Sequence, residues 1–210
     1  PLLVFSIFSC KKEKANTPNI VWLVAEDQSQ YFFPFYGDKT VDLPNVGKLL
    51  ENGVLYDEMH SPYPVCAPAR SAIITGMYPS SIGTGNQRAY HQKRKVRPDS
   101  ESKLGFPYYS SKLAEAIKPF TQILRENGYY CTNNSKTDYN FKLTDEAWDE
   151  SSKNASWENR KKNQPFFAVF NFGVTHESSI WNRDKKKLKL DPNILKVPPV
   201  FPDDSITRHA

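Results

Sequence analysis

The run Asn19-Ile-Val-Trp-Leu-Val-Ala25 leads directly into Glu26-Asp27-Gln28. A continuous apolar run of this length, rich in β-branched residues, predicts a central parallel strand that is buried on both faces. Open α/β sheets bind their ligands just beyond the carboxyl ends of such strands. The carboxylates of Glu26 and Asp27 are therefore predicted to lie at a ligand-binding edge.

A second apolar run followed by polar residues occurs later in the chain. The run Pro165-Phe-Phe-Ala-Val-Phe-Asn-Phe172 predicts a second buried strand, which ends just before Thr175-His176-Glu177. Strands that alternate with helices indicate an α/β fold with a predominantly parallel central sheet flanked by helices. We expect further strands over 54–59 and 129–132 and helices over about 42–51, 71–75 and 114–127, with Pro119 as a candidate interruption of the last. Irregular structure or a helical excursion is expected over 145–164.

Length and composition are those of an ordinary globular protein. The 210 residues suffice for one domain with a sizeable core, and the formal net charge of +5 is modest. Such a charge can favour nucleic acid, an anionic membrane or a polyanionic substrate. Because zinc-ligand spacing and RNA-binding aromatic patterns are missing, we expect no nucleic-acid partner. The basic runs at 93–95 and 185–187 are interpreted as loop or solvated charge.

The first residues predict export. Pro1 to Phe8 is an apolar run, too short to span a bilayer but typical of the back half of a signal peptide. The following Ser9-Cys10 completes a pattern that resembles a bacterial lipobox, in which the cysteine is lipidated. We therefore expect a truncated signal segment over 1–10, a polar tether over 11–18, and an exported periplasmic or cell-surface lipoprotein held to the membrane only through Cys10. A plain secretion signal or a buried strand remains the alternative.

The motif Cys66-Ala-Pro-Ala-Arg70 is followed by Thr75-Gly76. A single Cys-x-Pro-x-Arg match usually arises by chance. Here, however, the motif is preceded by Glu26-Asp27 and by the stretch from Asp42 to Val54, so three motifs stand in one order. From about Pro18 onward the chain resembles the formylglycine-dependent sulfatases of the alkaline-phosphatase-like superfamily. The resemblance implies an alkaline-phosphatase-like α/β fold, with 19–210 as the N-terminal part of the catalytic domain. It also implies hydrolysis of sulfate esters or sulfamates on glycans.

The resemblance assigns the nucleophile to Cys66. In sulfatases this cysteine is oxidised to formylglycine, whose hydrate attacks sulfur with one hydroxyl and expels sulfate by elimination from the other. The implied partners are a formylglycine-generating enzyme and a sulfated glycan. Arg70 is expected to hold the modified residue and its charge in place. The family usually has Ser where this chain has Ala69.

A divalent cation is the second implied cofactor. Glu26 and Asp27 match the paired acidic residues that, together with the modified Cys66, ligate a cation, usually Ca²⁺. Hard cations prefer carboxylate oxygens, and a bound cation would neutralise the sulfate oxygens. The commoner pair is Asp-Asp, so Glu26 lengthens one ligand arm.

Two further residues complete the implied catalytic set. Lys136, within Asn134-Ser-Lys-Thr-Asp-Tyr-Asn-Phe141, matches the family lysine that binds sulfate, although Asp138 stands where a histidine is common. His176 matches the histidine that contacts sulfate or protonates the leaving group. These two stretches look most like the heparan N-sulfatase-like (sulfamidase-like) branch. We also expect Gln87, Arg88 and His91 to contact the sugar.

Several alternatives stay open. The family's remaining metal ligands and second lysine have no match before Ala210, so we expect an N-terminal fragment that is inactive alone. A related phosphoesterase is one competitor, although such enzymes usually carry Ser or Thr without Pro-x-Arg. A surface lipoprotein that binds sulfated polysaccharide without turnover is another. Cys131 is expected to be a buried hydrophobic residue, with no disulfide framework.

Overall fold

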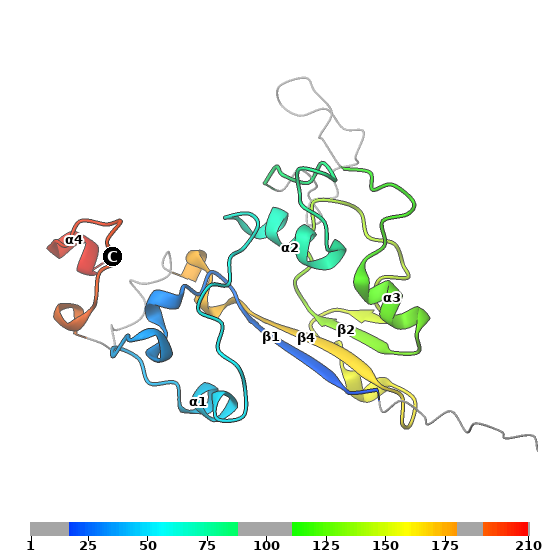
Figure 1. The fold of residues 1–210 in the computed structure, drawn as a ribbon, viewed down its shortest axis with the longest axis horizontal. Helices are drawn as coiled ribbons and strands as arrows, with labels where there is room; N and C mark the ends of the chain where they lie inside the picture. The colour runs from blue at the N-terminus through cyan, green and yellow to red at the C-terminus, as the bar shows by residue number, and fades with distance from the viewer. Residues whose placement is uncertain (1–16, 88–110, 180–190, 210) are drawn as a thin grey trace, which may run out of the picture.

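The computed structural model describes residues 17–87, 111–179 and 191–209. Within these ranges one four-stranded sheet runs in the order β1-β4-β2-β3, and every pair of neighbouring strands is parallel (Figure 1). The strands are β1 (Ile20–Ala25), β2 (Tyr130–Asn134), β3 (Glu150–Ser151) and β4 (Phe166–Phe172). The predicted α/β fold with a parallel sheet is confirmed.

Helices α2 and α3 lie over one face of this sheet, and α1 lies beyond the carboxyl end of β1 (Figure 1). Helix α2 starts at the motif cysteine and ends at Thr75, and its C-cap Gly76 has a left-handed φ of 67°. The α-helices are α1 (Pro44–Leu50), α2 (Cys66–Thr75), α3 (Phe120–Glu126) and α4 (Ser205–His209). The 3-10 helices within the described ranges are η1 (Gln30–Phe32), η2 (Pro34–Tyr36), η3 (Trp157–Asn159), η4 (Gly173–Thr175) and η6 (Pro192–Ile194).

Strand β1 does not occupy the predicted position. It forms one edge of the described sheet, and the residues Val21 and Leu23 are 49% and 57% exposed. The central position belongs to β4, whose residues from Phe166 to Val169 are buried. An apolar run therefore identified the strand correctly, but the described residues supply no strand or helix to cover both of its faces.

Three local predictions need correction. Residues 54–59 form turns and irregular structure instead of a strand, and Val54 and Met59 are 74% and 82% exposed. The helix predicted over 114–127, with Pro119 as a candidate interruption, begins only at Phe120, because Pro119 is its N-cap and cannot donate a helical hydrogen bond. The helix predicted over 71–75 begins earlier, at Cys66.

The core lies between the sheet and helices α2 and α3. Phe167 on β4 is 1% exposed, and its ring packs 5.0 Å from Trp22, 5.2 Å from Phe120 and 6.2 Å from Trp148. Cys131 is fully buried in the same cluster as a free thiol, as expected, and burial raises its pKa to about 12. The core therefore fixes the strands whose far ends carry the polar residues described next.

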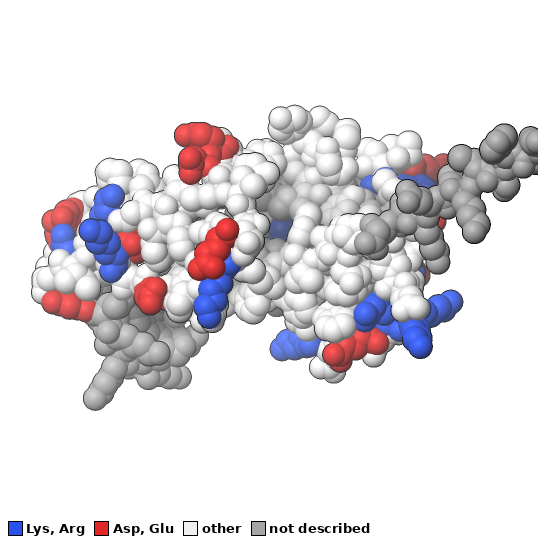
Figure 2. Space-filling view, turned by 60° about the horizontal axis from the view of Figure 1, so that its bottom comes forward, with Lys and Arg blue, Asp and Glu red and all other residues white. Residues whose placement is uncertain are grey.

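Figure 2 shows one face of the molecule, on which acidic and basic side chains stand in small groups between uncharged surface. The predicted lipidation site Cys10 and both basic runs lie outside the described residues. None of the helices in the described ranges has the length and apolarity needed to cross a bilayer.

Candidate active site

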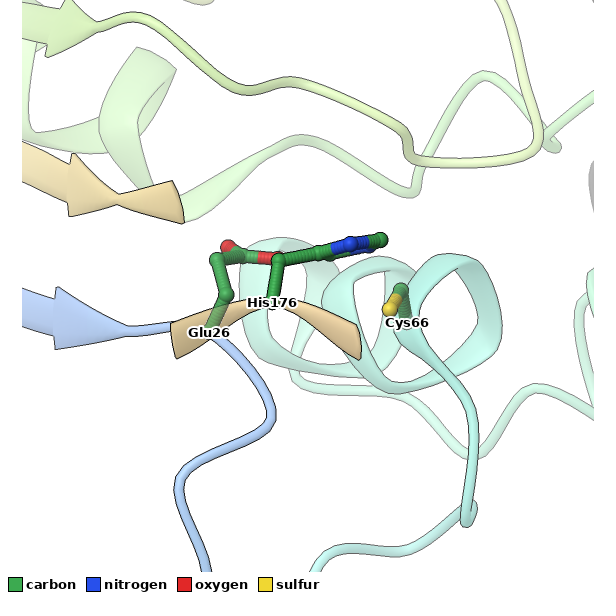
Figure 3. A group of neighbouring side chains, drawn as sticks. All are labelled: Glu26, Cys66 and His176. Carbon is green, nitrogen blue, oxygen red and sulfur yellow. The ribbon is translucent and has the colours of Figure 1, made fainter. Parts of the chain in front are cut away.

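The predicted site residues come together where the parallel strands end. Glu26 and Asp27 follow β1, Lys136 follows β2, and His176 follows β4 and η4, while Cys66 begins α2. Figure 3 shows Glu26, Cys66 and His176 gathered at this edge. Asp27 has a positive φ of 53°, a conformation that non-glycine residues seldom adopt and that is concentrated at functional sites. The topology therefore assembles residues that lie up to 150 positions apart in the chain.

Cys66 lies beside a carboxylate. Its Sγ is 3.6 Å from Asp27 Oδ1, and the residue is partly exposed. Burial raises the pKa of the Cys66 thiol; nearby Lys136 opposes the shift, and the carboxylates of Asp27 and Glu26 reinforce it. The thiol is therefore protonated at neutral pH, and a protonated thiol is a weak nucleophile.

Arg70 lies one helical turn after Cys66 and joins three parts of the sheet edge. Its Nη1 donates to Glu26 Oε1 at 3.2 Å, and its Nη2 donates to Asn171 Oδ1 at 2.9 Å. Its Nε and Nη2 also donate to the carbonyls of Thr137 and Lys136, at 2.9 and 2.7 Å. The planar guanidinium suits such a fixed set of acceptors. Arg70 thus holds Glu26 and the loop of Lys136, and does not contact the Cys66 side chain directly.

Lys136 supplies the second cation. Its ammonium donates to Glu26 Oε2 and lies 4.0 Å from Asp138 Oδ2, while the Glu26 side chain is only 6% exposed. Asp138, which stands where sulfatases often carry a histidine, therefore adds a negative charge here. Three carboxylates, those of Glu26, Asp27 and Asp138, face the two cations Arg70 and Lys136.

His176 faces Asp27 from the other side. Its Nε2 is 3.8 Å from Asp27 Oδ2, and its Nδ1 lies 2.9 Å from Ser178 Oγ and 3.1 Å from Ser178 N. The N–H of Glu177 donates to Asp27 Oδ2 at 3.0 Å. Burial raises the pKa of Asp27, but the Glu177 hydrogen bond, His176, Cys66 and Lys136 outweigh it, so the pKa is lowered overall. Asp27 is thus an anion that orients His176 and Cys66.

These residues fit a divalent cation. Ligand atoms of Glu26, Cys66 and His176 all lie within 4.8 Å of one another. Asp27 lies alongside them and brings a second carboxylate. The excess of carboxylates over cations leaves one negative charge for a metal ion to balance. The predicted ligands Glu26, Asp27 and Cys66 are therefore neighbours, and His176 joins them.

The structure places only one of the residues that are predicted to contact the sugar. Gln87 Oε1 accepts a hydrogen bond from Ala67 N at 3.4 Å, so the side chain caps the start of α2. This contact gives Gln87 a structural task, and its contact with sugar stays a prediction. Arg88 and His91 lie outside the described residues.

Two asparagines were missed by the sequence interpretation. Asn171 on β4 accepts from Arg70 and donates from Nδ2 to Asn133 Oδ1 at 3.0 Å and to Asn134 O at 3.2 Å. Asn133, fully buried on β2, donates to Lys136 O at 3.1 Å. The pair ties Arg70 and the Lys136 loop to the two inner strands. A polar residue near the end of an apolar strand, as in Phe-Asn-Phe172, was the available signal.

Known proteins share both sequence and fold with this chain. An ulvan-active sulfatase of Formosa agariphila is 50% identical over 164 residues, which cover 78% of this chain and 26% of that protein. A solved structure of a protein in complex with its substrate D-glucosamine-2-N,6-O-disulfate has a TM-score of 0.56 at 17% identity, covering 77% of this chain and 35% of that one. A 2-O GAG sulfatase has a TM-score of 0.57 at 18% identity, covering 89% and 41%.

The chain therefore spans about a quarter of the length of its Formosa relative. Because the two solved structures are less than 20% identical to this chain, their similarity supports the fold alone. The sequence model of the family described as Sulfatase matches residues 18–189, most of the chain. The order of motifs, the parallel sheet and this match lead to one conclusion: the chain belongs to the sulfatase family.

Proposed function

We propose that the protein containing this chain hydrolyses sulfate esters on a polysaccharide, with position 66 as its nucleophile after conversion of the cysteine to formylglycine. The observation that carries this proposal is the position of Cys66. It lies at the start of α2, 3.6 Å from Asp27 Oδ1, at an edge that also holds Lys136 and His176. Cysteine itself is poorly suited, because its raised pKa keeps the thiol protonated.

Formylglycine and a divalent cation would each supply one part of the chemistry. Formylglycine brings a hydroxyl nucleophile that can be regenerated, and a divalent cation such as Ca²⁺ neutralises charge on the sulfate oxygens. Glu26 and Asp27 would hold the cation together with position 66. Arg70 keeps the Glu26 carboxylate in place through the 3.2 Å contact, so its task is positioning.

Lys136 and His176 would act on the sulfate group itself. The ammonium of Lys136 contacts Glu26 Oε2 at the edge of the site, and we assign it to a sulfate oxygen, where negative charge grows in the transition state. His176 Nε2 points into the site, and Ser178 holds its Nδ1. When Nδ1 accepts from the Ser178 N–H, Nε2 carries the hydrogen, and this nitrogen can protonate the leaving oxygen.

For the substrate, we propose a sulfated polysaccharide of the ulvan class. The support is the Formosa agariphila relative, which is 50% identical and is described as an ulvan-active sulfatase. N-sulfated amino sugars form the second candidate, supported by the residue patterns around Lys136 and His176 that resemble sulfamidase-like proteins. Export with a lipid anchor at Cys10 belongs to the proposal, because a surface enzyme reaches polymers too large to enter the cell.

The test is sulfate release by the full-length protein, coexpressed with a formylglycine-generating enzyme. We expect activity on ulvan oligosaccharides and an aldehyde at position 66, seen in mass spectrometry of the tryptic peptide. Cys66→Ala should abolish turnover, whereas Cys131→Ser should keep it. Activity confined to N-sulfated glucosamine would move the substrate to the second candidate. Turnover of phosphate esters alone, or full activity with an unmodified Cys66, would contradict the proposed chemistry.

A further inference from the structure

The donor set of this site mixes two kinds of ligand. A sulfur from Cys66, an imidazole nitrogen from His176 and a carboxylate oxygen from Glu26 lie within 4.8 Å of one another (Figure 3). Calcium takes six to eight oxygen ligands and has little affinity for sulfur. Thiolate and imidazole together are typical of zinc. While Cys66 retains its sulfur, the site therefore has the composition of a zinc site.

The spacing of these atoms supports the same metal. In a tetrahedral site with ordinary bond lengths, a zinc-bound sulfur and a zinc-bound oxygen lie about 3.5 Å apart. Cys66 Sγ and Asp27 Oδ1 are separated by 3.6 Å. His176 Nε2 and Asp27 Oδ2 are separated by 3.8 Å. Asp27 is not one of the three residues whose ligand atoms all lie within 4.8 Å of one another, but it contacts two of them through different carboxylate oxygens. We therefore assign it as a fourth ligand beside Glu26.

The tautomer of His176 is compatible with this role. Ser178 presents both an N–H and a hydroxyl to Nδ1, at 3.1 and 2.9 Å. The N–H donates when Nδ1 is unprotonated, and the hydroxyl oxygen accepts when Nδ1 carries the hydrogen. In the second state Nε2 keeps a free lone pair for a metal, and such a partner on the other nitrogen is usual for histidine ligands.

We propose that the unmodified protein binds Zn²⁺ through Cys66 Sγ, His176 Nε2 and the carboxylates of Glu26 and Asp27. As the sulfur–zinc bond forms, the thiol proton passes to solvent, and no oxidation state changes. Conversion of Cys66 to formylglycine removes the sulfur and leaves a donor set that favours a hard cation. The zinc site itself stands on the geometry, and this switch of metal preference rests on the proposed function.

Lys136 competes with a bound metal ion for the carboxylate of Glu26. Its ammonium already contacts Glu26 Oε2, so a bound ion must displace it from that oxygen. Zn²⁺ brings two positive charges to a group in which three carboxylates face two cations, which favours the exchange. Lys136→Met removes the competing ammonium and should therefore bind Zn²⁺ more tightly than the wild type.

The experiment uses the full-length protein made without a formylglycine-generating enzyme and stripped of metal by chelation. Zn²⁺ is titrated against a chromogenic chelator, and Co²⁺ is used as a spectroscopic probe. We expect one Zn²⁺ per protein that depends on Cys66, and a near-ultraviolet thiolate-to-cobalt charge-transfer band. Cys66→Ser should abolish the band and weaken Zn²⁺ binding at least about 100-fold, since even changes to residues behind a ligand cost 10–100-fold.

Matched variants separate this site from other metal binding. Cys131→Ser and His60→Ala should keep both the band and the affinity, because Cys131 is buried in the core and His60 is an exposed partner of Glu58. His176→Ala should weaken binding. A band that survives Cys66→Ser, or no Zn²⁺ bound at this site, overturns the inference. If the modified enzyme releases sulfate while the cysteine form does not bind Zn²⁺, only this inference fails. Zinc binding without sulfatase activity would contradict the proposed function and the switch of metal preference, and would leave the zinc site itself supported.

Discussion

The two ends of strand β4 differ sharply. Its first half, around Phe167, is buried among aromatic rings and carries no polar side chain. Near its other end, Asn171 forms hydrogen bonds with Arg70 and Asn133. One end of the sheet is thus stabilised by the burial of apolar side chains away from water. The other end is stabilised by hydrogen bonds that hold charged side chains in place. The difference teaches that a single strand can serve folding at one end and chemistry at the other.

The largest expected effect tests the apolar end. Phe167→Ala should lower the free energy of unfolding by about 3–5 kcal/mol, because it removes a ring that is 1% exposed and leaves a cavity. Chemical denaturation of the full-length protein measures this change. Phe172→Ala, at the half-exposed end of the same strand, should change stability by only about 0.5 kcal/mol. Equal losses in the two variants would break the comparison.

At the polar end, Arg70→Met should reduce kcat by about 10²–10³-fold. Glu26 would lose a fixed partner, and the Lys136 loop would lose the donor to its carbonyl. Turnover per folded molecule is the measurement, with folding checked by circular dichroism. Arg160→Met is the matched control, since Arg160 stacks 4.9 Å from the rings of Trp157 and Phe166 and contacts no site residue. A similar fall in turnover for Arg160→Met would show that charge at any place on the sheet matters.

A smaller effect is expected at the asparagine pair. Asn171→Leu keeps the volume of the side chain but removes the acceptor for Arg70, so kcat should fall about tenfold, which corresponds to ~1.4 kcal/mol. KM should change less, because Asn171 does not face the substrate in our assignment. Asn171→Asp retains an acceptor and should recover part of the loss. Asn159→Leu, remote from the site, should leave kcat unchanged; a KM effect alone for Asn171→Leu would contradict a positioning role.

The smallest effect concerns a polar contact away from the site. Tyr130→Phe removes the hydroxyl that donates to Glu150 Oε1 at 2.7 Å, and should cost less than about 1 kcal/mol at neutral pH. The Tyr130 bond is the main cause that lowers the pKa of Glu150. A carboxyl group whose pKa is lower in the folded state than in the unfolded state stabilises the fold at pH values above its unfolded pKa. That stabilisation is lost as the pH falls through the folded pKa. Denaturation at several pH values should therefore show the difference shrinking in acid, and a constant difference would exclude this linkage.

Much of the fold was predictable because apolar runs report buried strands directly. The runs at Ile20–Ala25 and Phe166–Phe172 identified β1 and β4, and the polar residues after them marked the site edge. Strand order was not predictable, since an apolar run does not state which neighbours cover it. That is why β1 was expected at the centre, while the described sheet has it at an edge.

The sequence predicted which motif residues form the site, but it did not predict the asparagines that hold them in position. Cys66, Arg70 and the acidic pair stand in a motif order that resembles the sulfatases, so the resemblance predicted that they would lie in one site, while their catalytic roles stay predictions. Asn133 and Asn171 act through pairing across β2 and β4, which requires the register of two strands far apart in sequence. The simultaneous pairing of Glu26 with Arg70 and Lys136, through its two carboxylate oxygens, likewise depends on three-dimensional distances.

The open edge of β1 has a practical consequence for anyone who produces this stretch of 210 residues by itself. Val21 and Leu23 are half-exposed, and the side of the strand away from β4 has no partner within the described residues. Such an edge is a template on which another chain can add a strand. Recombinant expression of these residues alone should therefore yield inclusion bodies, and a lysine at Leu23, which is 57% exposed, should raise the soluble yield.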